Sequence, residues 1–245
     1  MSAPKLRADQ LLVARGLSPT RAKAQAAIAA GGVFADGQLV HKASQSLPMD
    51  CQLCCEPASA WVSRAGEKLD LAMRDLGLSA QGAHCLDIGA STGGFTQVLL
   101  AQGAASITSV DVGKDQLHPI VRADPRVRSF EGLDARALSP RHLVDAPALI
   151  VCDASFIAAH KVLGPALALA AAEAQALILI KPQYEAGAGK RVNDANCAAI
   201  AAEAGAHLDG LEGFDLRHLM PSKVRGAEGS QEFFALLAKD RAVRE

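Results

Sequence analysis

Four charged residues of this 245-residue chain have the types and positions that acid–base chemistry requires. Asp153 and Lys181 each follow a run of apolar residues and are therefore expected at the ends of buried strands. Lys68 lies in a segment that opens a helix, and Glu232 comes directly before another apolar run. The carboxyl ends of parallel strands meet at one crevice. A lysine held there and partly desolvated can act as a base, with carboxylates to orient it.

A glycine-rich segment, residues 85–97, is predicted to form a strand, a tight turn and the start of a helix. Its apolar first half ends on Asp87, and Gly89, Gly93 and Gly94 follow within a few residues. Glycines let a ligand approach the backbone, and the first turn of a helix offers free N–H groups. A dinucleotide site would carry G-x-G-x-x-G. The pattern D-x-G-x-x-x-G-G instead resembles the S-adenosylmethionine (SAM) loop of Rossmann-like methyltransferases; structural glycines in an ordinary strand–turn–helix are the alternative.

The composition favours an α/β protein with two parts. Half of the residues are apolar, but only 4% are aromatic, which favours helices over an all-β sandwich. The net charge of −1 is unevenly distributed. Residues 1–48 contain six lysines and arginines against two aspartates, so a basic N-terminal module is expected beside a mildly acidic one.

The cysteines and the apolar runs argue against a metal site and a membrane span. Cys51, Cys54 and Cys55 form a C-x-x-C-C cluster, but no second pair follows and His41 is the only nearby fourth ligand, so we expect free thiols and no zinc. No signal peptide is visible. The longest apolar run, residues 165–180, is interrupted by polar residues and is shorter than the ~20 residues that a span requires. These features predict a soluble cytoplasmic protein, and no pattern indicates an oligomeric state.

The first 56 residues predict two helices followed by a β-hairpin. The helices are expected over residues 6–15 and 20–30, and the hairpin over residues 33–40 with an Asp36-Gly37 turn. This pattern resembles the S4 RNA-binding domain. The matching positions are Arg7, Asp9, Leu12, Val13, Arg15, Gly16, Leu17, Arg21, Ala24, Ile28, Val33, Asp36, Gly37 and Val40.

Strand and helix patterns alternate through the rest of the chain, which predicts a doubly wound, mainly parallel sheet with a Rossmann-like fold. Helices are expected over residues 66–76 and 163–173. The strands after the glycine-rich segment are expected over residues 106–112, 127–131, 148–153, 176–180, 214–220 and 233–238. The predicted domains are 1–58, an S4-like domain; 59–62, a linker; and 63–245, the α/β domain.

Five motifs of the second domain resemble those of the FtsJ/RrmJ-type RNA 2′-O-methyltransferases. An S4 domain before such a domain further resembles the TlyA family of rRNA methyltransferases, whose members are also labelled hemolysins. The motifs are S-R-A-G-E-K-L at residues 63–69, the loop at 87–95, V-C-D-A-S-F at 151–156, L-I-K-P-Q-Y-E at 179–185 and G-S-Q-E-F-F at 229–234.

This resemblance implies a Lys-Asp-Lys-Glu tetrad made of Lys68, Asp153, Lys181 and Glu232, with Glu185 as the competing carboxylate for the last place. The implied reaction is an in-line transfer of the SAM methyl group to a ribose 2′-hydroxyl of rRNA, by family resemblance a cytidine. Lys181 would take the proton from the hydroxyl or orient it, and Asp153 would position Lys181. Lys68 and Glu232 would hold the ribose and its phosphate.

The resemblance also implies binding residues. Asp111 is expected to accept hydrogen bonds from the SAM ribose, and Asp134 either contacts the adenine amino group or caps a loop. The full set expected to bind SAM is Asp87, Gly89, Ser91, Thr92, Gly93, Gly94, Phe95, Asp111, Val112, Asp134 and Asp153. Contacts to rRNA or to ribosomal subunits are expected from Arg7, Arg15, Arg21, Lys23, Lys42 and Arg64.

Two other classes of function remain open. The chain could be an RNA- or ribosome-binding protein whose methyltransferase domain is inactive, although the intact tetrad argues against this. It could also be a membrane-active hemolysin, although no spanning segment or signal is visible. A dehydrogenase is disfavoured because G-x-G-x-x-G is absent.

Overall fold

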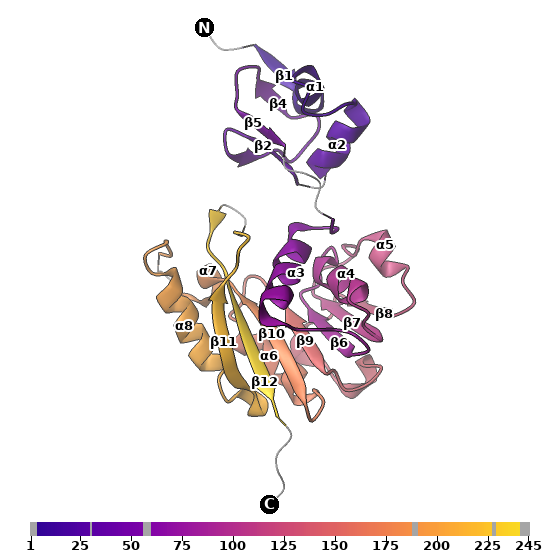
Figure 1. Ribbon diagram of the computed structural model, residues 1–245, viewed down its shortest axis with the longest axis vertical. Helices are drawn as coiled ribbons and strands as arrows, with labels where there is room; N and C mark the ends of the chain where they lie inside the picture. Colours follow the sequence, from indigo (N-terminus) through magenta and orange to yellow (C-terminus); the bar gives the residue numbers. More distant parts are fainter. Residues whose placement is uncertain (1–3, 30, 56–59, 188–190, 227–228, 241–245) are drawn as a thin grey trace, which may run out of the picture. The chain divides into compact units, whose positions relative to one another are not determined.

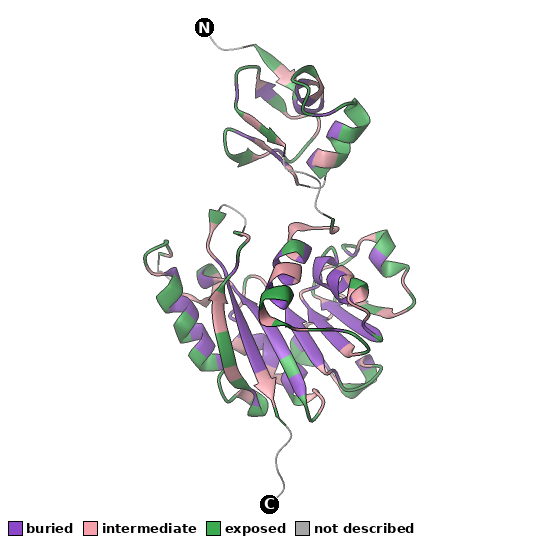
Figure 2. Ribbon diagram, viewed as in Figure 1, coloured by how far each residue is buried: buried purple, intermediate pink, exposed green. Residues whose placement is uncertain are grey.

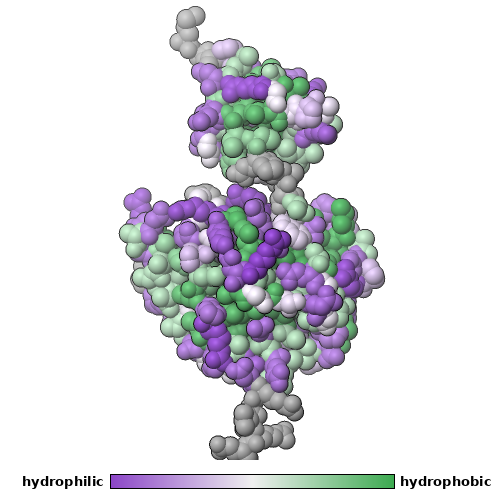
Figure 3. Space-filling view, in the orientation of Figure 1, coloured by the Kyte–Doolittle hydropathy of each residue, from purple (hydrophilic) through white to green (hydrophobic). Residues whose placement is uncertain are grey.

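The computed structural model describes residues 4–29, 31–55, 60–187, 191–226 and 229–240. The chain forms two compact units, an N-terminal unit of Met1–Arg64 and a C-terminal unit of Ala65–Glu245 (Figure 1). Hydrophilic residues are spread over the visible face of both units, with hydrophobic residues between them (Figure 3).

The N-terminal unit packs two helices against five short strands. Leu11, Leu12 and Ile28 are buried in its core, and Asp36 and Gly37 have the positive φ angles that a tight hairpin turn requires. Its elements are β1 (Lys5–Arg7), α1 (Ala8–Ala14), α2 (Arg21–Ala29), β2 (Val33–Ala35), β3 (Gln38–Leu39), β4 (Ser46–Pro48) and β5 (Leu53–Cys55).

Three strands of this unit differ from the sequence-based expectation. The first predicted helix begins at Ala8 and not at residue 6, because Lys5–Arg7 pairs with β4 as an antiparallel strand. No strand was predicted after the hairpin, but this stretch forms β4 and β5, and β5 pairs with β2. Each of these strands is three residues long, and its partner lies far away in the sequence, so local periodicity does not reveal it.

A seven-stranded sheet forms the centre of the C-terminal unit, in the order β11-β12-β10-β9-β6-β7-β8. The last five strands of this order are parallel, whereas β12 is antiparallel to both β10 and β11. The predicted mainly parallel, doubly wound sheet is therefore confirmed. The strands are β6 (His84–Ile88), β7 (Ser106–Asp111), β8 (Val127–Glu131), β9 (Leu149–Cys152), β10 (Ala174–Ile180), β11 (Asp215–Pro221) and β12 (Phe233–Lys239).

Helices cover both faces of this sheet, with α3 and α4 in front and α6 behind (Figure 1). The central strands are buried on both faces, whereas the edge strand β11 is largely exposed (Figure 2). The helices are α3 (Arg64–Leu76), α4 (Gly94–Ala101), α5 (Pro119–Arg122), α6 (His160–Ala168), α7 (Pro182–Glu185) and α8 (Cys197–Leu208), with 3-10 turns η1 (Ala135–Ala137), η2 (Pro140–His142) and η3 (Leu211–Gly213).

Helix α6 differs from the expected helix over residues 163–173. It begins three residues earlier, at His160, and ends at Ala168. The Glu185 carboxylate accepts a hydrogen bond from the Ala159 amide at 2.9 Å, and it thereby satisfies a free N–H at the start of the helix. This partner is 26 residues away in the sequence, so the sequence around residue 160 carries no sign of it.

The amphipathic helix α3 brings the first of the four predicted tetrad residues to the sheet. Leu69, Ala72 and Met73 are spaced i, i+3 and i+4, and all three are buried. Gly77, with φ +65°, ends the helix. Lys68 precedes this apolar stripe by one residue and is carried into the protein with it, at 8% exposure.

Candidate active site

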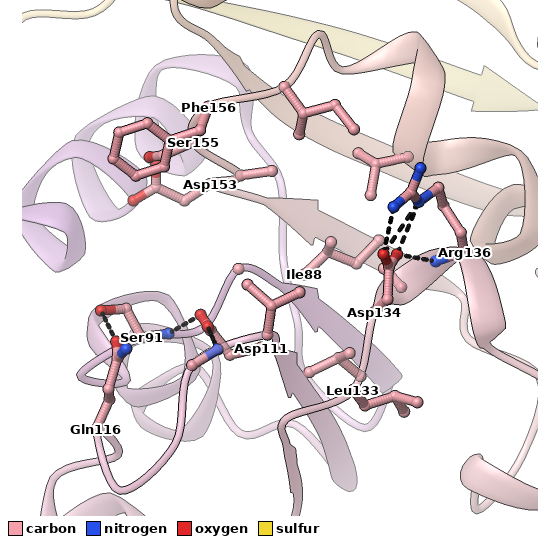
Figure 4. Close-up of a pocket in the computed structure, with 18 residues that line it drawn as sticks. Ile88, Ser91, Asp111, Gln116, Leu133, Asp134, Arg136, Asp153, Ser155 and Phe156 are labelled. Atoms are coloured by element: carbon pink, nitrogen blue, oxygen red, sulfur yellow. Dashed lines mark hydrogen bonds and ion pairs between the residues drawn. The ribbon is translucent and has the colours of Figure 1, made fainter.

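A cavity of about 390 Å³ opens at the carboxyl ends of β6, β7 and β9. The chain passes from β6 to β7 on one side of β6 and later returns to β9 on the other side. Ligands bind at such a switch point in open α/β sheets. Figure 4 shows Asp111 and Ser91 on one side of the cavity, Leu133 and Asp134 on another, and Asp153, Ser155 and Phe156 above them.

The glycines of the loop after β6 make close packing possible inside the protein. A Cβ built at Gly89 would lie 2.9 Å from the backbone of Asp153 and Ala154, and one at Gly93 would lie 2.7 Å from Leu117. Both glycines also have positive φ angles, at +77° and +91°. Gly89 therefore lets the loop pack directly against the end of β9. Gly89 also lines the cavity, whereas Gly93 does not.

Asp111 ends β7 and faces the cavity in a fixed orientation. One of its carboxylate oxygens accepts a hydrogen bond from the Ser91 amide, and the other accepts one from the Gly113 amide, both at 2.7 Å. Each oxygen of a carboxylate has two lone pairs. Asp111 therefore keeps acceptor capacity for a ligand's hydroxyl groups, as expected for the SAM ribose.

Asp134 lines the cavity, but its carboxylate is already paired. Both oxygens accept hydrogen bonds from the Arg136 guanidinium, and one also accepts from the Arg136 amide at the start of η1. These bonds lower the pKa of Asp134 to about 2. The geometry thus gives Asp134 the loop-capping role, and an adenine contact would have to share its oxygens with Arg136.

Five residues of the expected SAM set do not line this cavity. The Thr92 carbonyl instead accepts a hydrogen bond from the His118 amide. The Phe95 ring stacks on the Phe234 ring, with 6.4 Å between the ring centroids. Val112, Gly89, Ser91, Asp111, Asp134 and Asp153 do line it. The five that do not are Asp87, Thr92, Gly93, Gly94 and Phe95.

Asp87 was predicted to bind SAM, and its burial has an electrostatic consequence. It is fully buried within β6, and Thr96 Oγ1 donates a hydrogen bond to its Oδ2 at 2.5 Å. Asp87 thus holds the helix that follows the loop, and its contact with the cofactor stays a prediction. Burial disfavours the charged carboxylate and raises its pKa from 3.8 to about 7.

Stability is expected to depend on pH through Asp87. As the pH rises from about 4 to about 7, the unfolded chain loses the Asp87 proton while the folded protein keeps it. The folded state therefore loses up to ~1.4 kcal/mol of stability for each pH unit in that window. Asp87→Asn stays neutral, so its midpoint of thermal unfolding should match the wild type near pH 4 and exceed it at pH 8. Glu203→Gln, at an exposed position of α8, is the control. A difference in unfolding midpoint that does not change with pH would contradict the raised pKa of Asp87.

Lys181 and Asp153 form the polar centre of the site. Lys181 Nζ lies 2.6 Å from Asp153 Oδ1, 2.6 Å from Ser155 Oγ and 3.3 Å from the Asp153 main-chain oxygen. The side chains of Lys181 and Asp153 are 10% and 17% exposed. Because little water reaches this ion pair, the attraction between the two charges is strong, and it holds both side chains in one geometry.

Lys68 and Glu232 form a second pair, with 2.6 Å between Nζ and Oε2. Their side chains are 9% and 3% exposed. The chain before Glu232 folds closely over its carboxylate, since a Cβ at Gly226 would come within 2.3 Å of Oε1. Glu185, the competing carboxylate, instead caps α6, and burial raises its pKa.

Strand register brings the two pairs to the same end of the sheet. Ile180 of β10 pairs with Phe233 of the antiparallel β12. Lys181 follows Ile180 and Glu232 precedes Phe233, so these two residues continue from neighbouring strands at the same edge. The four predicted tetrad residues are therefore linked through two ion pairs and one strand pairing.

Three site residues had no predicted role. Thr96 holds Asp87, and Ser155 contacts Lys181. Phe156 lines the cavity, and its ring centroid lies 5.1 Å from that of Tyr184. The residue is 87% exposed and has a φ angle of +68°. An exposed aromatic residue in a left-handed conformation is uncommon. The sequence feature that could have indicated a role for Phe156 is its place in the motif D-A-S-F-I, next to Asp153 and Ser155.

The basic residues of the N-terminal unit have two kinds of surroundings. Arg7 and Arg21 both pair with the fully buried Asp9 at 3.0 Å, and they hold the pKa of that carboxyl well below its usual range. Arg15 donates hydrogen bonds to the main-chain oxygens of Met49 and Cys51. Lys23 and Lys42 are exposed, and Arg64 begins α3.

Within the described ranges, no cluster of histidine, cysteine, aspartate and glutamate has the arrangement of a metal site. The six cysteines carry free thiols. No helix in the same ranges is both long and apolar enough to cross a bilayer.

The fold and the site together define a methyltransferase. Residues 61–239 match the FtsJ-like methyltransferase family, and residues 6–49 match the S4 domain. The 16S/23S rRNA (cytidine-2′-O)-methyltransferase TlyA of Mycobacterium tuberculosis is 37% identical over 98% of this chain and 93% of its own length. The 23S rRNA (cytidine-2′-O)-methyltransferase TlyA of Campylobacter jejuni is 34% identical over 74% of this chain and 72% of its own.

A solved structure described as a hemolysin from Streptococcus thermophilus superimposes with a TM-score of 0.71 and 32% identity. The match covers 98% of this chain and 90% of that one. The chain belongs to the TlyA family of FtsJ-like methyltransferases.

The methyl donor is S-adenosylmethionine, and the cavity suits it. A volume of about 390 Å³ lies within the usual range for small-molecule sites. Ile88, Val110 and Leu133 give it apolar walls, while Asp111 and Asp153 present carboxylates to a cationic ligand.

Proposed function

We propose that this protein methylates a ribose 2′-hydroxyl of ribosomal RNA, on a cytidine, and that it does so in the cytoplasm, where ribosomes are. The observation that carries the proposal is the Lys181–Asp153 ion pair at the edge of the cofactor cavity. The relatives from M. tuberculosis and C. jejuni support the substrate, since both are named as cytidine-2′-O rRNA methyltransferases.

The chain's own residues supply position and proton transfer. S-adenosylmethionine supplies a methyl group carried on a positively charged sulfur. Lys181 receives the proton of the ribose hydroxyl, and Asp153 holds Lys181 and presents negative charge to the cavity. Lys68, on helix α3, and Glu232, directly before strand β12, support the ribose and its phosphate. Alignment of the hydroxyl with the methyl group provides much of the rate.

Phe156 and the N-terminal unit give the RNA two places of contact. An exposed aromatic ring beside the cavity is suited to stacking on an unpaired base. The basic S4 domain is suited to phosphate contacts and to RNA shape.

Methyl transfer to isolated ribosomal subunits and to free rRNA tests the proposal. Radiolabelled SAM should place its label in RNA, and digestion to nucleosides should recover it as 2′-O-methylcytidine. Label in a base, or no label with any RNA, would overturn the proposal. The latter result together with tight RNA binding would identify an inactive binding protein, and dye release from liposomes would identify a membrane-active one.

Charge removal in the N-terminal unit should weaken RNA binding without unfolding the unit. Lys23 and Lys42 are exposed, so Lys23→Gln with Lys42→Gln should lower affinity for rRNA and reduce the slope of log K against log salt by about 2. Arg15→Ala, in contrast, should lower the unfolding midpoint, because its guanidinium bonds to main-chain oxygens.

Filter binding at several salt concentrations, with Lys161→Gln of the C-terminal unit as the control, measures the effect on affinity. Wild-type affinity and slope in the double variant would show that these two lysines do not contact RNA.

A further inference from the structure

Ser155 touches the proposed base, yet the mechanism above gives it no role. Its Oγ lies 2.6 Å from Lys181 Nζ, the same distance as the Asp153 carboxylate oxygen. Ser155 and Asp153 line the cofactor cavity, whereas Lys181 is not among the residues that line it. Ser155 therefore lines the cofactor cavity and also contacts the lysine through its hydroxyl.

Three protein oxygens lie close to the lysine nitrogen. Nζ donates hydrogen bonds to Ser155 Oγ and to the Asp153 main-chain oxygen, and Asp153 Oδ1 forms an ion pair with it at 2.6 Å. The main-chain oxygen is covered by the glycine loop, since a Cβ at Gly89 would lie 3.0 Å from it. A ribose hydroxyl would therefore have to compete with these protein oxygens for a direct contact with Nζ.

The chemistry of these three partners decides where the lone pair of a neutral lysine points. A carboxylate oxygen and a carbonyl oxygen only accept hydrogen bonds, whereas a hydroxyl both donates and accepts. A neutral Lys181 would donate its two N–H groups to the two Asp153 oxygens. Its lone pair then faces Ser155, which is the one partner able to donate a proton to it.

We propose that Ser155 Oγ carries the proton from the ribose 2′-hydroxyl to Lys181. This inference rests on the proposed function. The ribose O–H proton passes to Ser155 Oγ as the Ser155 hydroxyl proton passes to the lone pair of Lys181 Nζ. The ribose oxygen bonds to the methyl carbon, and the methyl–sulfur bond breaks with its electron pair remaining on sulfur, which becomes neutral. Lys181 ends as an ammonium beside Asp153, and the Ser155 hydroxyl is restored.

Substitution of Ser155 separates this role from a structural one. Ser155→Ala should lower the single-turnover rate by about 10²-fold or more, and Ser155→Thr, which keeps the hydroxyl, should recover most of it. SAM affinity by calorimetry and the unfolding midpoint should stay within the range of the exposed control Ser129→Ala. In mixtures of H₂O and D₂O, the wild-type rate should show two protons in transfer, and the residual Ser155→Ala rate should show one.

The outcomes distinguish this inference from the proposed function. A wild-type protein that makes no 2′-O-methyl product would overturn both. Wild-type transfer with a Ser155→Ala rate within about threefold would overturn the inference alone. A slow Ser155→Ala that Ser155→Thr fails to restore, or that still shows two protons in transfer, would also overturn it, since Ser155 would then act only by packing.

Discussion

Replacement of Lys181 by alanine is expected to lower the rate of methyl transfer by about 10²- to 10⁴-fold while SAM binding is retained. A positioned general base contributes a factor of this size. Lys181 is not among the residues that line the cofactor cavity, so the loss should fall on the chemical step and not on cofactor affinity. Single-turnover methyl transfer and calorimetric SAM binding measure the two effects separately.

A second substitution at this position distinguishes a base from a fixed positive charge. Lys181→Arg keeps the charge, but a guanidinium is not deprotonated in proteins and cannot accept the proton. We expect it to be about as slow as Lys181→Ala. The exposed Lys161→Ala on α6 is the matched control. A Lys181→Arg protein with the wild-type rate would show that Lys181 acts through its charge.

Glu232→Ala is expected to damage stability as well as activity. The substitution would leave the Lys68 ammonium buried without its carboxylate, and breaking a buried pair from one side costs about 3–5 kcal/mol. Lys223 and Asp75 are a matched control, since their ion pair is 2.7 Å long but 59% and 35% exposed. Lys223→Ala should cost less than about 1 kcal/mol. Urea unfolding of the three proteins gives the comparison.

The double substitution Lys68→Met with Glu232→Leu separates the two roles of this pair. Apolar residues of similar volume can replace a buried ion pair with little loss of stability. The double variant should therefore recover most of the stability lost by Glu232→Ala, yet it should still fail to methylate RNA. If methyl transfer returned along with the stability, the pair would have only a structural role.

The sequence was sufficient to predict the parts of the site that follow directly from buried strands. β9 and β10 are near-continuous apolar runs, and the first charged residue after each one is a site residue. Asp153 and Lys181 could therefore be placed at strand ends, and parallel packing brought them together as expected. The same reasoning predicted Asp111 at the end of β7.

Other features depend on contacts that no local pattern carries. The choice between Glu232 and Glu185 depends on the antiparallel insertion of β12 between β10 and β11. Asp87 was expected to bind the cofactor because an acid follows an apolar run. It is instead held by Thr96, nine residues later, on the helix that covers the strand. The contact of Ser155 with Lys181 likewise spans 26 residues.

Synthesis of the chain imposes an order on when this site can work. Lys68 and Glu232 are 164 positions apart, and the strand that places Glu232 is the last one in the sheet to be made. A growing chain can already contain the S4 domain, the cofactor loop and all five parallel strands while it still lacks this carboxylate. Closing so long a loop has an entropic cost, which the packing of β12 in the sheet helps to offset. On the proposed role of Glu232, an unfinished copy is unable to methylate the RNA of the ribosome that is making it.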